Sequence, residues 1–137
     1  MKVEELEAGV LTSKIFNVQK PSDATITMLY VGWSSSTGDA DWALRPLFAT
    51  SAFPPVLFNV AWYSNPIVDK ALQDGLATTE PARRAAAYAT VQEQVWKDAP
   101  WIFLAVPHNL AAYAKGLKGA YVRPDAQFDL DQDATLN

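Results

Sequence analysis

One nearly uninterrupted hydrophobic run stands out in the first part of the chain. Residues 25–31, TITMLYV, are β-branched or large and apolar, without the polar alternation of a half-exposed strand. Such a run is typical of a β-strand that is buried on both faces. Gly32 and Trp33 end it, and small polar residues follow as far as Gly38. We therefore expect a buried strand that leads into a polar loop.

Helical spacing of apolar residues occurs in four places. Asp39 or Asp41 can cap a short helix that ends near Phe48. Asn65 followed by proline is a strong start signal for a second helix, whose apolar face continues to Leu76. Residues 8–18 and 82–97 complete the set, and the alanines of the latter favour helix strongly.

Short extended segments are expected elsewhere. They cover residues 2–6, 100–107, 109–114 and 121–123. The first of them, the helix 8–18 and the strand 25–31 would form a right-handed βαβ unit. Pro54-Pro55 makes residues 49–61 irregular, residues 116–119 are expected to turn, and the aspartate-rich residues 125–137 are expected to fray. The predicted fold class is α/β, a mixed sheet with flanking helices.

Composition narrows the class of protein. The chain has 137 residues, half of them hydrophobic, which indicates one domain with one core. Its net charge is −4 and its basic residues are scattered, so nucleic-acid binding is not expected. The nearest basic cluster, Arg83-Arg84, is expected on an exposed helix face. There is no cysteine, no secretory signal after Met1, and no apolar run long enough to cross a bilayer.

Few residues could support catalysis. Asp39 and Asp41 invite comparison with the paired carboxylates of glycosidases, but two aspartates at a helix start are more often caps. His108 is the single histidine, so a serine nucleophile has one candidate base and a His-rich zinc site is excluded, although carboxylates could hold calcium loosely. We expect neither enzyme activity nor a cofactor.

The polar loop is better suited to binding. Ser34, Ser35 and Ser36 place hydroxyls at the expected mouth of a strand, where open α/β sheets bind ligands. The free N–H groups of the helix start that follows attract carboxylates and phosphates. From composition alone, a polar loop that needs no ligand is an equally open interpretation.

Three motifs now suggest a family. Residues 32–41 resemble the segment G-W-x-x-D-x-G-D-P-D, residues 63–72 match Y-S-N-P-x-V-D-x-x-L, and residues 98–102 are similar to D-A-P-x-I-P-L. In this order and spacing, the motifs resemble the extracellular solute-binding proteins (family 5) that feed peptide-type ABC importers. The sequence of residues 32–48 is most similar to that of the glutathione-binding branch of the family.

The resemblance implies an architecture. It covers nearly the whole chain but corresponds to the C-terminal part of a family whose members are several times longer. Residues 1–98 would then be part of the second lobe of a two-lobed, type II-like periplasmic binding protein. Residues 99–137 would be strands that return to the first lobe. Met1 would be an added start, and such a partial lobe is expected to self-associate through uncovered apolar strands.

The resemblance also implies a ligand site around the loop. In peptide-binding members, the third residue after the tryptophan is an aspartate that pairs with the ligand's α-amino group, and here it is Ser36. A neutral serine cannot supply that charge-assisted bond, which favours glutathione over an ordinary peptide N-terminus. The expected ligand-binding residues are Trp33, Ser34, Ser35, Ser36, Asp39, Arg45, Asn59 and Trp62.

Some of these residues have an alternative role. Trp33 could pack in the core, as we expect of Trp42. Arg45 could pair with Asp39 or Asp41 instead of meeting a substrate carboxylate.

The resemblance predicts capture of glutathione or a related small peptide in the periplasm, for delivery to an inner-membrane ABC permease. A general di-/oligopeptide or other small-solute receptor of the same family is the alternative. Two further alternatives are a hydrolase that uses Asp39 and Asp41 and a fragment with no function of its own.

Overall fold

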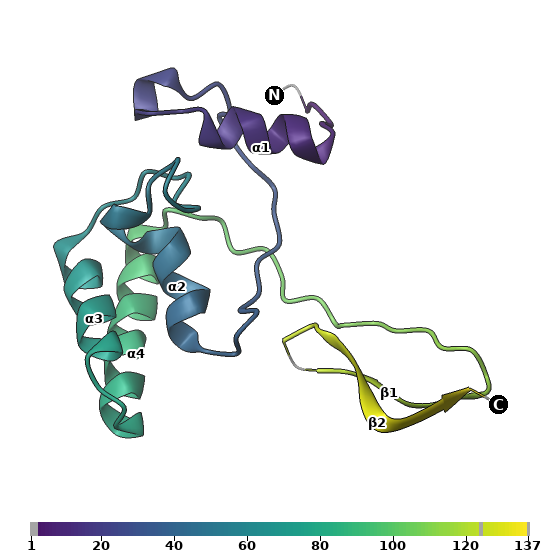
Figure 1. Ribbon diagram of the computed structural model, residues 1–137. Coiled ribbons are helices and arrows are strands. Elements are labelled where there is room, and N and C mark those ends of the chain that lie inside the picture. Colours follow the sequence, from purple (N-terminus) through teal and green to yellow (C-terminus); the bar gives the residue numbers. More distant parts are fainter. Residues whose placement is uncertain (1–2, 124, 137) are drawn as a thin grey trace.

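The computed structural model describes residues 3–123 and 125–136, and these contain four α-helices and one two-stranded antiparallel sheet (Figure 1). The helices are α1 (Ala8–Phe16), α2 (Ala40–Phe48), α3 (Pro66–Leu76) and α4 (Pro81–Asp98), and the strands are β1 (Leu117–Val122) and β2 (Phe128–Leu136). The predicted α/β class is confirmed, and its sheet is a hairpin. All four predicted helices are present, with ends within two residues of the expected ones.

The core lies between three helices. Helices α3 and α4 lie side by side as a helical hairpin, and α2 packs across them (Figure 1). Val68 and Leu72 of α3 and Val91 of α4 are fully buried, because they recur at helical spacing on facing sides. Gly75 allows the two helices to approach closely, since a Cβ there would lie 2.7 Å from Cζ of Tyr88.

Local signals set the helix boundaries. The side chain of Asp39 accepts a hydrogen bond from the backbone N–H of Asp41, and Asn65 does the same for Ile67. Helix α4 ends at Asp98, and the next residue, Ala99, adopts the left-handed conformation that terminates many helices. Of the two caps considered for α2, Asp39 is the one observed, and the cap predicted at Asn65 is confirmed.

The predicted buried strand at residues 25–31 is wrong. The segment has no strand structure, and Met28 and Tyr30 are 65% and 86% exposed. A strand buried on both faces needs neighbours that accept its hydrogen bonds, and the described residues provide none beside it. The βαβ unit is consequently absent.

The other early and late strands are also missing. The described residues of the segment 2–6, and all of 100–107 and 109–114, are without regular structure. Val106 and Leu110 are more than 90% exposed. The same reason applies, because apolar composition alone does not form a strand without a partner.

The C-terminal residues are more ordered than expected. Strands β1 and β2 pair antiparallel from Leu117↔Leu136 to Val122↔Phe128, so the expectation of a fraying tail is wrong. The predicted strand at residues 121–123 forms part of β1, while the predicted turn at 116–119 is mostly strand. Arg123 pairs with Asp125 at 2.8 Å and with Asp129 at 3.4 Å, which ties the hairpin together near its turn.

Some expectations lie outside the described residues, namely those for Met1, Lys2, Pro124 and Asn137. The division of the chain after residue 98 stays a prediction. It coincides with the end of α4.

Candidate functional site

The polar loop before α2 is held by its own hydrogen bonds. The Ser35 hydroxyl donates to the backbone carbonyl of Asp39 at 2.8 Å and lies 3.2 Å from the Thr37 hydroxyl. The backbone N–H of Asp39 donates to Thr37 Oγ1 at 3.2 Å. Gly38 has a φ of +70°, which a residue with a side chain rarely adopts. The loop is thus a tight structure that leaves Ser34 and Ser36 exposed.

The position of this loop differs from the expected one. It does not follow the carboxyl end of a strand, because residues 25–31 form none. What remains of the predicted site is a serine-rich loop at the start of α2, without a sheet edge behind it. The interpretation of a strand-end mouth is therefore corrected.

Asp39 forms an ion pair with a distant arginine. Arg84 of α4 donates to both carboxylate oxygens of Asp39, at 2.6 and 2.8 Å. The same guanidinium donates to the Gly75 carbonyl of α3 at 2.9 Å and lies 5.2 Å from the ring centre of Tyr88. The N-terminus of α2 is in this way fixed to the α3–α4 hairpin.

Asp41 forms a second ion pair. Arg45 approaches its carboxylate at 2.6 Å and also donates to the Leu72 carbonyl at 2.7 Å. This hydrogen bond to Asp41 raises the pKa of the Arg45 guanidinium. Tyr88 donates to Asp41 at 3.2 Å, and burial, followed by the Asp41 charge, raises the pKa of its phenol. The salt-bridge alternative for Arg45 is the one observed.

The two tryptophans near the loop behave differently from each other. Trp33 is half-buried, packs against the core and lies 5.1 Å from Phe58 between ring centres. Its indole N–H is buried, and no described residue accepts a hydrogen bond from it. Trp42 is 38% exposed, so the expectation that it lies in the core is wrong. The apolar face of α2 is carried instead by Leu47 and Phe48.

Asn59 and Trp62 lie in the segment that connects α2 to α3. Asn59 is fully buried, and its amide donates to the carbonyls of Ala49 and Tyr63 at 2.9 and 2.8 Å. It also accepts from the Tyr63 N–H. Trp62 is half-buried against Phe53, at 5.0 Å between ring centres. Asn59 thus stabilises the conformation of its own loop. Ligand contact by Asn59 or Trp62 stays a prediction.

Arg84 was missed by the sequence interpretation. It was expected on an exposed helix face, yet its side chain is only 23% exposed. The available signal was its position one turn before Tyr88, on the same face of α4 as Val91 and Val95. An arginine at the edge of an apolar stripe buries its stem and directs its charge toward a partner.

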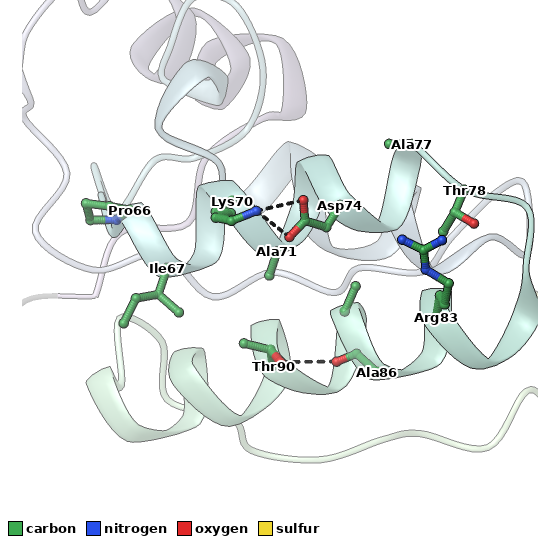
Figure 2. A pocket seen from close by; sticks show the side chains of 11 residues that line it. Pro66, Ile67, Lys70, Ala71, Asp74, Ala77, Thr78, Arg83, Ala86 and Thr90 are labelled. Carbon is green, nitrogen blue, oxygen red and sulfur yellow. Dashed lines mark hydrogen bonds and ion pairs between the residues drawn. The ribbon is translucent and has the colours of Figure 1, made fainter.

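A hollow also lies away from these residues. It is a groove of about 900 Å³ between α3 and α4, and Figure 2 shows the small side chains Ala71 and Ala86 on its walls. Lys70 and Asp74 pair across one helical turn beside it. Within the described residues, no cluster of potential metal ligands is present. Among the described helices, none combines the length and apolarity that a membrane crossing requires.

Comparison with known proteins supports the predicted resemblance. The chain is 43% identical over 136 residues to the glutathione-binding protein GsiB of Pectobacterium atrosepticum. It is 40% identical over 135 residues to proteins of the same name from Escherichia coli K12 and Shigella dysenteriae. No family model matches the chain.

These alignments cover 98–99% of this chain but 26% of each relative. The chain therefore spans about a quarter of the length of the curated relatives that it matches. The likeness to the glutathione-binding branch, predicted from residues 32–48, is confirmed, and the alignments extend over nearly the whole chain.

Proposed function

We propose that this chain forms part of a solute-binding protein that captures glutathione or a related small peptide. Capture would take place in the periplasm, and the ligand would pass to an inner-membrane ABC permease without chemical change. The observation that carries the proposal is the identity of 40–43%, along nearly the whole chain, to proteins named as glutathione-binding.

The geometry of the loop is consistent with a small ligand that carries carboxylates. Ser34 and Ser36 are exposed, while Ser35 and Thr37 hold the loop in shape. Exposed hydroxyls donate readily to a carboxylate. The buried indole N–H of Trp33 has no acceptor among the described residues and is a further donor.

Asp39 keeps capacity for the ammonium of the ligand. Three hydrogen bonds reach its carboxylate, two from Arg84 and one from the Asp41 N–H. A carboxylate has about four acceptor positions, so one remains for a further donor. The side chain is 49% exposed and therefore accessible.

The hydrolase alternative has less support. Asp39 and Asp41 are each paired with an arginine, at 2.6 Å in both cases. Both carboxylates therefore act as structural ion-pair partners, one to α4 and the other within α2. The general peptide receptor differs from our proposal in its ligand alone.

The test is a graft. The 135 residues of the E. coli relative that match this chain are replaced by it, and binding is measured by calorimetry. We compare glutathione with the α-linked tripeptide Glu-Cys-Gly, which has the same composition and differs in one linkage. The unaltered E. coli protein is the control, and circular dichroism verifies that the graft folds.

We expect the graft to bind glutathione and to bind the α-linked peptide at least about tenfold more weakly, because an extra or missing hydrogen bond in a polar site is worth about 1–3 kcal/mol. A folded graft without affinity for glutathione would contradict the proposal. Equal affinity for both peptides would instead favour the general peptide receptor.

A further inference from the structure

A continuous set of contacts connects the α3–α4 hairpin to the serine loop. It begins at the Gly75 carbonyl of α3, which accepts from Arg84 at 2.9 Å. Arg84 then holds both oxygens of Asp39. The backbone carbonyl of Asp39 accepts a hydrogen bond from the Ser35 hydroxyl, and its N–H donates to Thr37 Oγ1.

The ion pair between Arg84 and Asp39 is the one contact of this set that crosses from the helical hairpin to the loop segment. Residues 35, 37 and 39 are neighbours in sequence and would form their bonds locally. The ion pair with Arg84 joins residues 45 positions apart. It therefore anchors the serine loop to the helical hairpin, next to the hydrogen bond of Tyr88 to Asp41 at the start of α2.

The guanidinium is itself firmly placed. Its side chain is 23% exposed, it stacks over the Tyr88 ring at 5.2 Å, and it uses both terminal nitrogens. Tyr88 is buried and is fixed in turn by its hydrogen bond to Asp41. A planar fork held in this way restricts its partner more than a flexible lysine would.

We propose that Arg84, acting through Asp39, is a positioning residue that orders the loop 34–38 for ligand binding. The proposal rests on the proposed function, because it assigns ligand contact to that loop. It adds a residue that lies outside the three family motifs.

Hydrogen exchange of the 137-residue chain tests the ordering without any ligand. In Arg84→Gln, we expect faster exchange at the amides of Gly38 and Asp39, with unchanged exchange in the middle of α3. Arg83→Gln is the matched control, since it removes the same charge one residue away from a side chain that is 72% exposed. In Arg83→Gln, the amides of Gly38 and Asp39 should exchange as they do in the parent chain.

The grafted protein tests the effect on binding. We expect Arg84→Gln to lower the affinity for glutathione about tenfold, a typical size for coupling through a contact network. Arg83→Gln should stay within about twofold, because exposed ion pairs contribute little. Val91→Ala, which loosens the core, should lower Tm at least as much as Arg84→Gln and leave the affinity unchanged.

A second variant guards against a general folding defect. Asp39→Asn keeps an acceptor for the Asp41 N–H but removes the charge that Arg84 holds. Asp39→Asn should speed amide exchange in the loop as much as Arg84→Gln does. The double variant of Arg84→Gln and Asp39→Asn should show no further increase. Arg84→Lys should restore part of the protection.

The outcomes separate the two proposals. Unchanged exchange at Gly38 and Asp39 in Arg84→Gln would overturn the positioning role, as would an affinity loss no larger than that of an equally destabilised Val91→Ala. A parent graft that fails to bind glutathione would overturn the proposed function, and the exchange result would still decide the role of Arg84.

Discussion

Asp39 combines several contacts at one position. Its side chain caps α2 through the Asp41 N–H at 2.7 Å and pairs with Arg84, and its carbonyl receives the Ser35 hydroxyl. Each contact is common in itself, but together they make the residue the junction between loop, helix and core. Substitution here is expected to disturb all three parts together.

The exposed serines give the first prediction. In the grafted protein, the double variant Ser34→Ala with Ser36→Ala should lower the affinity for glutathione about tenfold. Each hydrogen bond from a hydroxyl to a ligand is worth about 0.5–1.5 kcal/mol. Calorimetry measures the change. Ser22→Ala is the control, since that hydroxyl bonds to its exposed neighbour Asp23. Unaltered affinity in the double variant would remove these two serines from the site.

Sequence predicted the residue-scale features that are local. The cap at Asp39 follows from its place before a helical pattern, and the pairing of Arg45 with Asp41 follows from a spacing of four residues. The partner of Asp39 could not be found in this way. Arg84 is 45 residues away, and the two residues meet only because α2 packs against α4.

At the scale of elements, the α3–α4 contact depends on a glycine. Gly75→Ala should lower the free energy of unfolding by about 1–3 kcal/mol, because the new Cβ would lie 2.7 Å from the buried Tyr88 ring. The clash outweighs the gain in helix propensity of about 1 kcal/mol. Denaturant unfolding measures the difference. Gly32→Ala is the control, since its Cβ would meet nothing within 4 Å.

The ends of these two helices are joined by a carboxylate with pH-dependent effects. Asp98 accepts hydrogen bonds from Gln94 at 2.8 Å, from Tyr63 at 2.6 Å and from Asn65 at 2.7 Å. These bonds, that of Gln94 first, lower the pKa of Asp98. A lowered folded-state pKa stabilises the fold above the unfolded-state pKa, and this stabilisation is lost as pH falls through the folded value.

Asp98→Asn should therefore lower Tm at pH 7 and reduce the loss of Tm between pH 5 and pH 2. Thermal unfolding followed by circular dichroism measures both effects. Asp74→Asn removes a carboxylate from an exposed pair with Lys70 and serves as the control. A parent-like Tm profile in Asp98→Asn would show that the three hydrogen bonds add no pH-dependent stability.

Helices and strands differed in how well the sequence predicted them. Helices α2, α3 and α4 carry their hydrogen bonds within themselves, so capping residues and apolar spacing were sufficient. Residues 25–31 have an equally clear strand composition, but a strand requires a second strand from elsewhere. The β1–β2 hairpin did form, because its two strands are adjacent in the chain.

Over the whole molecule, a small helical core stands next to long uncovered segments. Residues 102–113 are all exposed, and they include Ile102, Leu104, Val106 and Leu110. Apolar surface of this kind commonly marks a contact with another chain or another part of the same protein. We expect the isolated chain to self-associate through it.

Light scattering tests this expectation over a range of concentrations. The apparent mass should rise with concentration, and Leu104→Glu with Leu110→Glu should return it toward 15.0 kDa. Gln73→Glu with Gln127→Glu adds the same charge at polar positions and should leave association intact. A constant monomer mass for the parent chain at high concentration would refute the expectation.

The shielded indole of Trp33 has a practical consequence. Trp96 is 72% exposed and Trp42 is 38% exposed, so their emission is red-shifted and open to quenching by acrylamide. Trp33 packs against the core directly before the serine loop, so we expect it to emit at the blue edge of the spectrum, together with the half-buried Trp62 and Trp101. If the proposed function holds, a molecule bound at the serine loop should change that blue edge.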